Sequence, residues 1–351
     1  MWLTCSSIGR KFVMALTGIC LVLFVTFHVL MNAVALIWPG AYNAVCEFLG
    51  ANWYALIASA GLAALFIIHI IYALWLTVQN RRARGVDRYA VNAHYPGVEW
   101  SSKNMLVLGI VVIAFLVVHM VQFWSKMQLQ ELLSHNLSDF PTVNGLVADP
   151  AYGTLFLQMA FSQWYTPVIY IIGFIALWFH MNHGFWSMFQ TIGWNNTTWL
   201  PRLKKIALWW TSIVVALFIA QAIVFTVRAN QNYYTTDEAL VEQYTKGLAE
   251  RAEEPVTKFM ESWQTIQQQA MYGGGQQMMQ QFIAENGQQY LDQLAPIADA
   301  AKAMPAAASD RYLSTAMQIV DMLREQMQQA TPVEEATAVE EVVEETTDSI
   351  N

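Results

Sequence analysis

Five long apolar stretches constrain the fold of this chain most strongly, and they lie near residues 12–37, 54–79, 104–125, 166–190 and 206–228. Each is long enough to cross ~30 Å of hydrocarbon, which takes about 20 helical residues. Backbone polar groups find no water inside a bilayer, so each stretch is expected to be a helix. The sequence therefore predicts an all-α fold, an integral membrane bundle of five transmembrane helices.

The charge distribution separates this bundle from an extension at its C-terminal end. Residues 1–230 carry 12 Lys and Arg against 6 Asp and Glu, whereas residues 231–351 carry 6 against 20. We expect a transmembrane domain over 1–230 and a helical extramembrane appendage over 231–329. The final segment, 330–351, is acidic and poor in large apolar groups, which is typical of disorder.

Two apolar periodicities predict helices in the appendage. The glycines of YGGGQQMMQQF (272–282) indicate a break between two helices. No Cys or His occurs after residue 230, so we expect no metal or haem chemistry there and a small helical module that is able to pair with a second copy. The periodic residues are Phe259, Trp263, Ile266 and Ala270 in one stretch, and Leu313, Ala316, Val320, Leu323 and Met327 in the other.

Lysines and arginines give the spans a direction. Ten of the 12 cations in residues 1–230 precede the first span or lie in the loops that join the second to the third and the fourth to the fifth. Loops rich in Lys and Arg stay in the cytoplasm. The N-terminus is therefore predicted to be cytoplasmic and the extension, after five crossings, to lie outside. One wrongly assigned helix would move the extension inside.

Histidines inside the spans are the candidate functional residues, because ionisable side chains are rare in hydrocarbon. At ~1.5 Å per residue, His28 and His119 lie about 23 Å from the cytoplasmic edge, and His69 and His180 about 15 Å. Each depth receives one imidazole from each of two helices. This arrangement suits two six-coordinate haems, each bound between facing helices.

Other roles for these histidines remain open. Each one alone could be a hydrogen-bonded core residue, although two depth-matched pairs favour ligands. A dinuclear metal site is disfavoured because the first four predicted spans contain no Asp or Glu. His183 follows His180 by three residues on a neighbouring face. We interpret it as a residue that supports the ligand or contacts a haem propionate, though it could replace His180.

Four segments make the chain similar to a known family. FHVLMN (27–32), IIHIIYALWL (67–76), VVHMVQFW (117–124) and FHMNHGFWSMFQTIGW (179–194) resemble the dihaem cytochrome b membrane-anchor subunits of succinate dehydrogenase and fumarate reductase. The likeness covers about residues 5–228 and includes the five-helix count and the order of the histidines. It implies two haems b, the cytoplasmic-side one held by His69 and His180 and the outer one by His28 and His119.

The resemblance also implies partners. A flavoprotein with FAD and an iron–sulfur protein would bind the cytoplasmic face, in a bacterial inner membrane, and a homodimer of the whole complex is compatible with it. This chain has neither a Gly-rich dinucleotide fingerprint nor clustered cysteines, so dicarboxylate chemistry would belong to another subunit. Its expected ligands are membrane lipid and menaquinone or another quinone, with no nucleic acid.

A carboxylate near the start of the second helix handles quinol protons in similar subunits. The resemblance suggests Glu47 for this role, and an ordinary solvated position is the alternative. Some relatives also carry a glutamate two residues before the haem ligand of helix 4, where this chain has Trp178. That departure puts a transmembrane proton route in doubt.

Two other functions compete with this interpretation. A cytochrome b of another quinone-linked enzyme, such as formate dehydrogenase or hydrogenase, would carry similar histidines on different partners. A haem-free membrane scaffold or transporter would use the histidines structurally. A reduced-minus-oxidised spectrum separates the last from the others, and the co-purifying subunits separate the first two.

Overall fold

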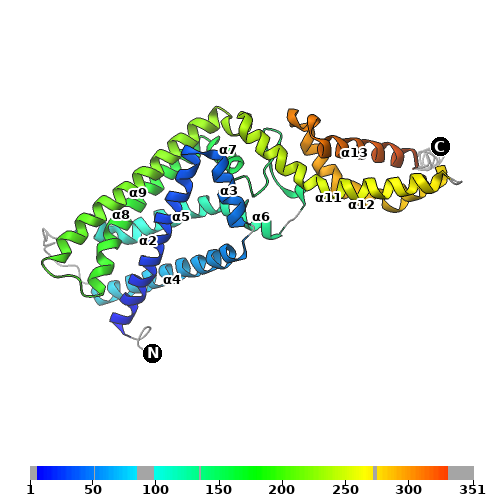
Figure 1. Cartoon of the computed structure of the whole chain (residues 1–351). Coiled ribbons are helices and arrows are strands. Elements are labelled where there is room, and N and C mark those ends of the chain that lie inside the picture. Colours follow the sequence, from blue (N-terminus) through cyan, green and yellow to red (C-terminus); the bar gives the residue numbers. More distant parts are fainter. Residues whose placement is uncertain (1–5, 51, 85–98, 134–135, 272–274, 331–351) are drawn as a thin grey trace, which may run out of the picture. The chain divides into compact units, whose positions relative to one another are not determined.

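A computed structural model describes residues 6–50, 52–84, 99–133, 136–271 and 275–330 of the chain (Figure 1). Helices dominate the described residues, and the predicted all-α membrane bundle is confirmed. The chain divides into two compact units. Unit 1 comprises Met1–His135 and Ala148–Leu240, and unit 2 comprises Asn136–Val147 and Val241–Asn351.

Five helices of unit 1 are long and apolar enough to span a membrane, in agreement with the five predicted stretches. Each begins within a few residues of its predicted start, or a little before it. The chain is accordingly a multi-pass membrane protein. The five helices are α2 (Ser7–Ile37), α4 (Trp53–Arg84), α5 (Trp100–His119), α8 (Tyr165–Thr191) and α9 (Trp199–Asn230).

Helix α8 is the centre of this bundle, because it packs against α2, α5 and α9. Helix α4 lies at its edge and packs chiefly against α2. None of the most apolar window of α4 is buried, and Ile57, Ile67 and Ile71 point outward. An apolar outer face is what a lipid-facing helix requires.

Close contacts fix two of these helix pairs. Gly173 of α8 lies against the ring of Phe115 on α5, where any Cβ would collide with it. Such small residues let membrane helices approach closely. Arg228 of α9 donates to the carbonyl oxygens of Ala35 (2.7 Å) and Leu36 (2.9 Å) at the C-terminal end of α2. These carbonyls have no partner within their own helix, so the guanidinium caps it.

Shorter elements complete unit 1 at the end where α2 and α5 finish. Helix α5 continues as a π-helical turn, Met120–Trp124, closed by the bond from Ser125 N to Met120 O (2.8 Å). Turns of this kind often mark functional sites. The other short helices are α3 (Pro39–Gly50), α6 (Gln128–Leu133), α7 (Gly153–Phe161) and α10 (Tyr233–Thr236).

Among the residues that the structure describes, unit 2 contains two short 3-10 turns and three long helices, the first of which begins in unit 1. The predicted helices around Phe259 and Leu313 are confirmed, and a further helix follows the predicted break. A two-stranded hairpin, β1 (Thr142–Val143) and β2 (Leu146–Val147), turns through Asn144 and Gly145 at positive φ, as a tight Asn-Gly turn requires. The helical elements are η2 (Leu137–Asp139), α11 (Glu238–Ala270), α12 (Gly275–Lys302), η3 (Pro305–Ser309) and α13 (Arg311–Ala330).

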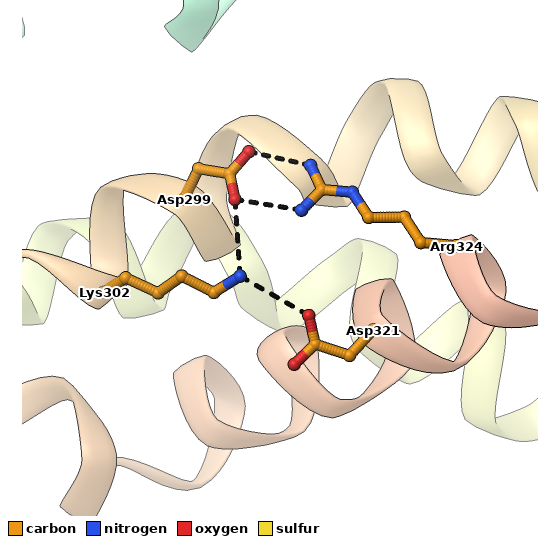
Figure 2. A network of polar contacts seen from close by, with 4 residues as sticks. All are labelled: Asp299, Lys302, Asp321 and Arg324. Carbon is orange, nitrogen blue, oxygen red and sulfur yellow. Dashed lines mark hydrogen bonds and ion pairs between the residues drawn. The ribbon is translucent and has the colours of Figure 1, made fainter.

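Packing and surface charge both join α12 to α13. The predicted apolar stripe of α13 is fully buried at Leu313, Val320 and Leu323. Figure 2 shows a network of four residues on the surface. Both terminal nitrogens of Arg324 donate hydrogen bonds to the carboxylate of Asp299, at 3.2 and 2.8 Å. Lys302 completes it between Asp299 (3.6 Å) and Asp321 (3.4 Å). Exposed pairs of this kind stabilise a fold by about 1 kcal/mol or less.

The unit boundaries differ from the sequence-based division at 230 and 231. Unit 1 extends to Leu240 because α10 buries Tyr234 completely. Residues 136–147 belong to unit 2, and Leu137 and Leu146 are buried. The predicted disordered tail lies outside the described residues, as do His94 and His135.

Candidate cofactor-binding site

A large cavity of about 2120 Å³ in unit 1 is lined mainly by α2, α4, α5 and α8, with further residues from α3, α6, α7 and α9. Its walls are mostly aliphatic and aromatic side chains. An ordinary small-molecule pocket has a volume of about 300–1,000 Å³, so this cavity has room for more than one ligand. The five histidines predicted from the sequence all line it: His28, His69, His119, His180 and His183.

The outer histidine pair joins α2 to α5. The ring centroids of His28 and His119 lie 5.7 Å apart with the planes at 86°. Phe24 stacks on His28 (5.4 Å between centroids), and Phe115 stacks on His119 (5.9 Å). These aromatic rings restrict the orientation of both imidazoles, which line the same cavity.

The inner histidine pair joins α4 to α8. The ring centroids of His69 and His180 lie 6.4 Å apart with the planes at 63°. Gly18 of α2 and Gly109 of α5 approach these rings, and a Cβ on either would lie 3.8 Å or 3.7 Å from the Cε1 of His69 or His180. The structure thus brings together the two pairs that the depth argument predicted.

Hydroxyl groups orient one ring of each pair. Thr17 Oγ1 lies 3.0 Å from Nδ1 of His69, and Tyr170 Oη lies 3.2 Å from Nδ1 of His119. A metal-binding histidine usually bonds its second ring nitrogen to such an oxygen, which fixes the tautomer and the ring orientation. The Nε2 atoms of these two rings remain available as ligands.

His180 has a different environment. Among the residues that the structure describes, its buried Nδ1 atom has no hydrogen-bond partner. A buried polar atom left in this state costs about 1–3 kcal/mol. This nitrogen thus differs from Nδ1 of His69 and of His119, each of which lies beside a hydroxyl group.

The residues present fit haem at both pairs. In each pair, two imidazoles from different helices lie 5.7 or 6.4 Å apart between centroids and line the same large apolar cavity. Two imidazoles from facing helices are a set of side chains that would hold a haem. A Cβ on Gly61 or Gly184 would meet no atom within 4 Å, so open space adjoins the cavity walls there.

A bare metal ion fits less well. Within the described ranges, no group of three or more His, Cys, Asp or Glu side chains is placed to hold one. Two histidines suffice when a macrocycle supplies the remaining ligands. The arrangement consequently favours a metal that arrives in a macrocycle.

His183 belongs to a charged cluster at the opposite end of the cavity from the outer pair. Its Nδ1 lies 3.4 Å from Glu99 Oε2, and Lys204 donates to Glu99 Oε1 at 2.7 Å. Burial opposes ionisation of Glu99, but the hydrogen bonds from Lys204 and His183 outweigh it and lower the pKa of this carboxyl. His183 therefore supports the site through Glu99, and the structure pairs His180, not His183, with His69.

Glu47 is not brought into the histidine cavity. It is exposed and lines a pocket of about 550 Å³ that shares Phe48, Asn52 and Tyr54 with the wall of the histidine cavity. Glu131 of α6 lines the histidine cavity instead, and its carboxylate lies directly against Gly50, where any Cβ would collide with it. No sequence pattern singled out Glu131, because its place depends on how the chain turns after the π-helical segment.

Trp178 is the residue at which the sequence resemblance suggested a departure from some relatives. Its indole N–H donates to Ser212 Oγ at 3.0 Å and so joins α8 to α9. The residue has a packing role here.

Comparison of the whole chain with family models, curated proteins and solved structures gives no match.

Proposed function

We propose that this chain is the membrane-anchor cytochrome b subunit of a succinate dehydrogenase/fumarate reductase complex in a bacterial inner membrane. Two histidine pairs support this proposal most directly. Each pair is formed by two helices, and both pairs line one large apolar cavity. The sequence resemblance over residues 5–228 supplies the family.

The chain's own residues account for haem binding. His28 and His119 would hold one haem b, and His69 and His180 the other. When bound, each haem supplies a one-electron carrier. Thr17 and Tyr170 orient two of the four imidazoles, and the aromatic walls exclude water from the pairs.

Two haems at different depths suit electron transfer across the membrane. Helical rise separates the pairs by ~8 Å along the bilayer normal. We place the inner pair, His69 and His180, near the cytoplasmic face, because positive charge gathers in the loops at that end. The flavoprotein with FAD and the iron–sulfur protein would bind that face and carry out the interconversion of succinate and fumarate.

Menaquinone or another quinone would react at the outer end of the cavity, where α2 ends and α4 begins. Oxidation of a quinol releases two protons with its two electrons, so a nearby base accelerates it. Glu131 lines the cavity at this end, together with Gln128 and Trp124. Its position favours it over the exposed Glu47 as the proton acceptor.

Purification of the native complex in mild detergent tests the proposal. We expect a flavoprotein and an iron–sulfur protein to co-purify and the complex to couple quinol oxidation to fumarate reduction, or succinate oxidation to quinone reduction. A different set of partners, such as a formate dehydrogenase or hydrogenase, would overturn the assignment even if haem is present.

A further inference from the structure

Three side chains form a polar path from the outer histidine pair to α3. Tyr42 on α3 donates its hydroxyl proton to Asn32 Oδ1 at 3.2 Å. Asn32 Nδ2 in turn donates to the carbonyl oxygen of His28 at 2.8 Å and lies 3.3–3.4 Å from both ring nitrogens of that residue. Through this path, the orientation of the Asn32 amide determines which polar group faces the His28 imidazole.

The hydroxyl of Tyr42 and the carbonyl oxygen of His28 together fix which end of the Asn32 amide faces the imidazole. Tyr42 is almost fully buried, and burial, followed by the neighbouring Cys46, raises its pKa well above the usual value. The phenol therefore keeps its proton and donates it. Because Oδ1 accepts this proton, Nδ2 is turned toward His28, and a donor group faces the ring.

The other two partnered imidazoles face oxygen. Thr17 donates its own proton to a carbonyl of the preceding turn, at Val13 (3.0 Å) or Met14 (3.1 Å), so its oxygen can accept the ring proton of His69. Tyr170 Oη lies 3.2 Å from Nδ1 of His119, and it can accept the proton of that nitrogen when Nε2 serves as the metal ligand. Among the described residues, the only hydrogen-bond partner of the His28 ring is the Asn32 amide nitrogen.

Helix α3 is held firmly enough to keep Tyr42 in place. Asn43 Oδ1 accepts from both the backbone N–H (3.0 Å) and the hydroxyl (2.7 Å) of Thr154 on α7. Gly153 lies against Tyr42 and Cys46 so closely that any Cβ would collide with Cys46 Sγ. Helix α3 is thus clamped between α2 and α7.

We infer that Tyr42 is a positioning residue that, through Asn32, withholds a hydrogen-bond acceptor from His28 and so raises the electron affinity at the outer pair. The inference rests on the proposed function, because it needs an iron bound to His28. An imidazole whose second nitrogen donates to an acceptor becomes more basic and favours the oxidised metal. His28 lacks that acceptor and favours the reduced metal.

Tyr42→Phe tests this in the intact complex by redox titration of the two haems. Without the phenol, only the bond from Nδ2 to the His28 carbonyl oxygen holds the amide in its present orientation. An amide that leaves this orientation can offer Oδ1 to the ring proton of His28. We expect the outer couple to become about tenfold harder to reduce, which for one electron is a fall of ~59 mV. The inner couple should not move.

Asn32→Asp provides a second variant that does not depend on the amide flip. A carboxylate can accept from Tyr42 and from His28 at once, so the outer couple should fall further than in Tyr42→Phe. Thr17→Val removes the acceptor from His69 and should raise the inner couple alone. Tyr165→Phe, at an exposed tyrosine of α8, is the matched control and should change neither couple.

The possible failures are distinguishable. If the purified complex contains no haem, the proposed function fails and the inference fails with it. If both haems are present and Tyr42→Phe and Asn32→Asp leave the outer couple within the error of Tyr165→Phe, the inference alone is wrong. A shift of both couples together would also overturn it, because that result indicates a general change in packing.

Discussion

At the residue scale, the four paired imidazoles differ in what their second ring nitrogens contact. His69 and His119 face hydroxyl oxygens, His28 faces an amide nitrogen, and Nδ1 of His180 has no described partner. Such contacts govern how strongly a histidine donates to a metal. We therefore expect two haems in this cavity to have different midpoint potentials.

Variants of two glutamates, Glu131 and Glu47, distinguish the proposed proton acceptor from a solvated residue. Glu131→Gln removes the carboxylate that lines the cavity and should lower quinol oxidation about 100-fold or more, as loss of a general base does. Glu47→Gln is the matched control, since that side chain is exposed and lies outside the cavity. Steady-state quinol oxidation and haem content are the measurements.

Both variants should retain both haems, because neither glutamate is one of the four proposed haem ligands. If Glu47→Gln stops turnover and Glu131→Gln does not, the quinone reacts elsewhere and our placement is wrong. The result would then favour the assignment suggested by the resemblance.

Glu99 gives the cluster that it forms with Lys204 and His183 a pH dependence with a definite sign. Its pKa is lower in the folded chain than the ordinary value of 4.5, owing to hydrogen bonds from Lys204 and His183 that outweigh burial. The stabilisation is therefore fully present above pH 4.5 and is lost as the pH falls through the folded pKa. Because the side chain is about one-third exposed (34%), the gain is about 1 kcal/mol or less.

Thermal unfolding of the wild type and Glu99→Gln checks this expectation. We expect the variant to unfold at a slightly lower temperature at pH 7, and the two midpoints to converge as the pH falls through the folded pKa of Glu99. A difference that grows on acidification would contradict the sign of the shift. Lys204→Gln is a useful control, since it should reproduce most of the loss at pH 7.

The positions of the histidines could be predicted from the sequence, whereas most of their partners could not. Helical rise is constant, so residue number converts directly to depth and pairs His28 with His119. Asn32 was also within reach of prediction, because it follows His28 by one helical turn. Thr17 and Tyr170 lie 52 and 51 residues from their histidines, and only the packing of helices brings them near.

At the scale of elements, Arg228 connects the last membrane helix to the end of the first. Arg228→Met removes two charged hydrogen bonds to the carbonyls of Ala35 and Leu36 and should destabilise unit 1 by about 2 kcal/mol. Arg228→Lys keeps the charge at the helix C-terminus but loses the bidentate hydrogen bonding of the guanidinium. We therefore expect it to destabilise unit 1 by about half as much as Arg228→Met. The midpoint of thermal unfolding in detergent measures both.

Equal midpoints for the wild type and both variants would show that the cap contributes nothing. A loss that is the same for Lys and Met would indicate that geometry, not charge, holds α2.

Element boundaries followed from the sequence where a physical rule was strong. The length of the apolar stretches predicted the five membrane helices, and the apolar stripe of α13 predicted its buried face. The hairpin around Asn144 and Gly145 was not anticipated, although Asn-Gly is a known turn signal. Nor could the π-helical turn after His119 be predicted, since π turns have no comparable sequence rule.

At the scale of the whole molecule, the charge distribution and the cavity give one account. Unit 1 carries the basic loops, the five membrane helices and the paired histidines, and the acidic extension supplies most of unit 2. A carrier of electrons between quinone and peripheral subunits needs only unit 1 for the chemistry. The helices of unit 2 were predictable, but the association of residues 136–147 with them was not, because it depends on contacts between distant segments.

Haem content measured as the pyridine haemochrome tests the central claim most directly, in the purified complex and in four single variants. We expect two haems b per chain in the wild type and one in each of His28→Ala, His119→Ala, His69→Ala and His180→Ala. The spectrum that remains should be the same within each pair and different between the pairs. A protein without haem, or His28→Ala and His69→Ala losing the same haem, would contradict the account.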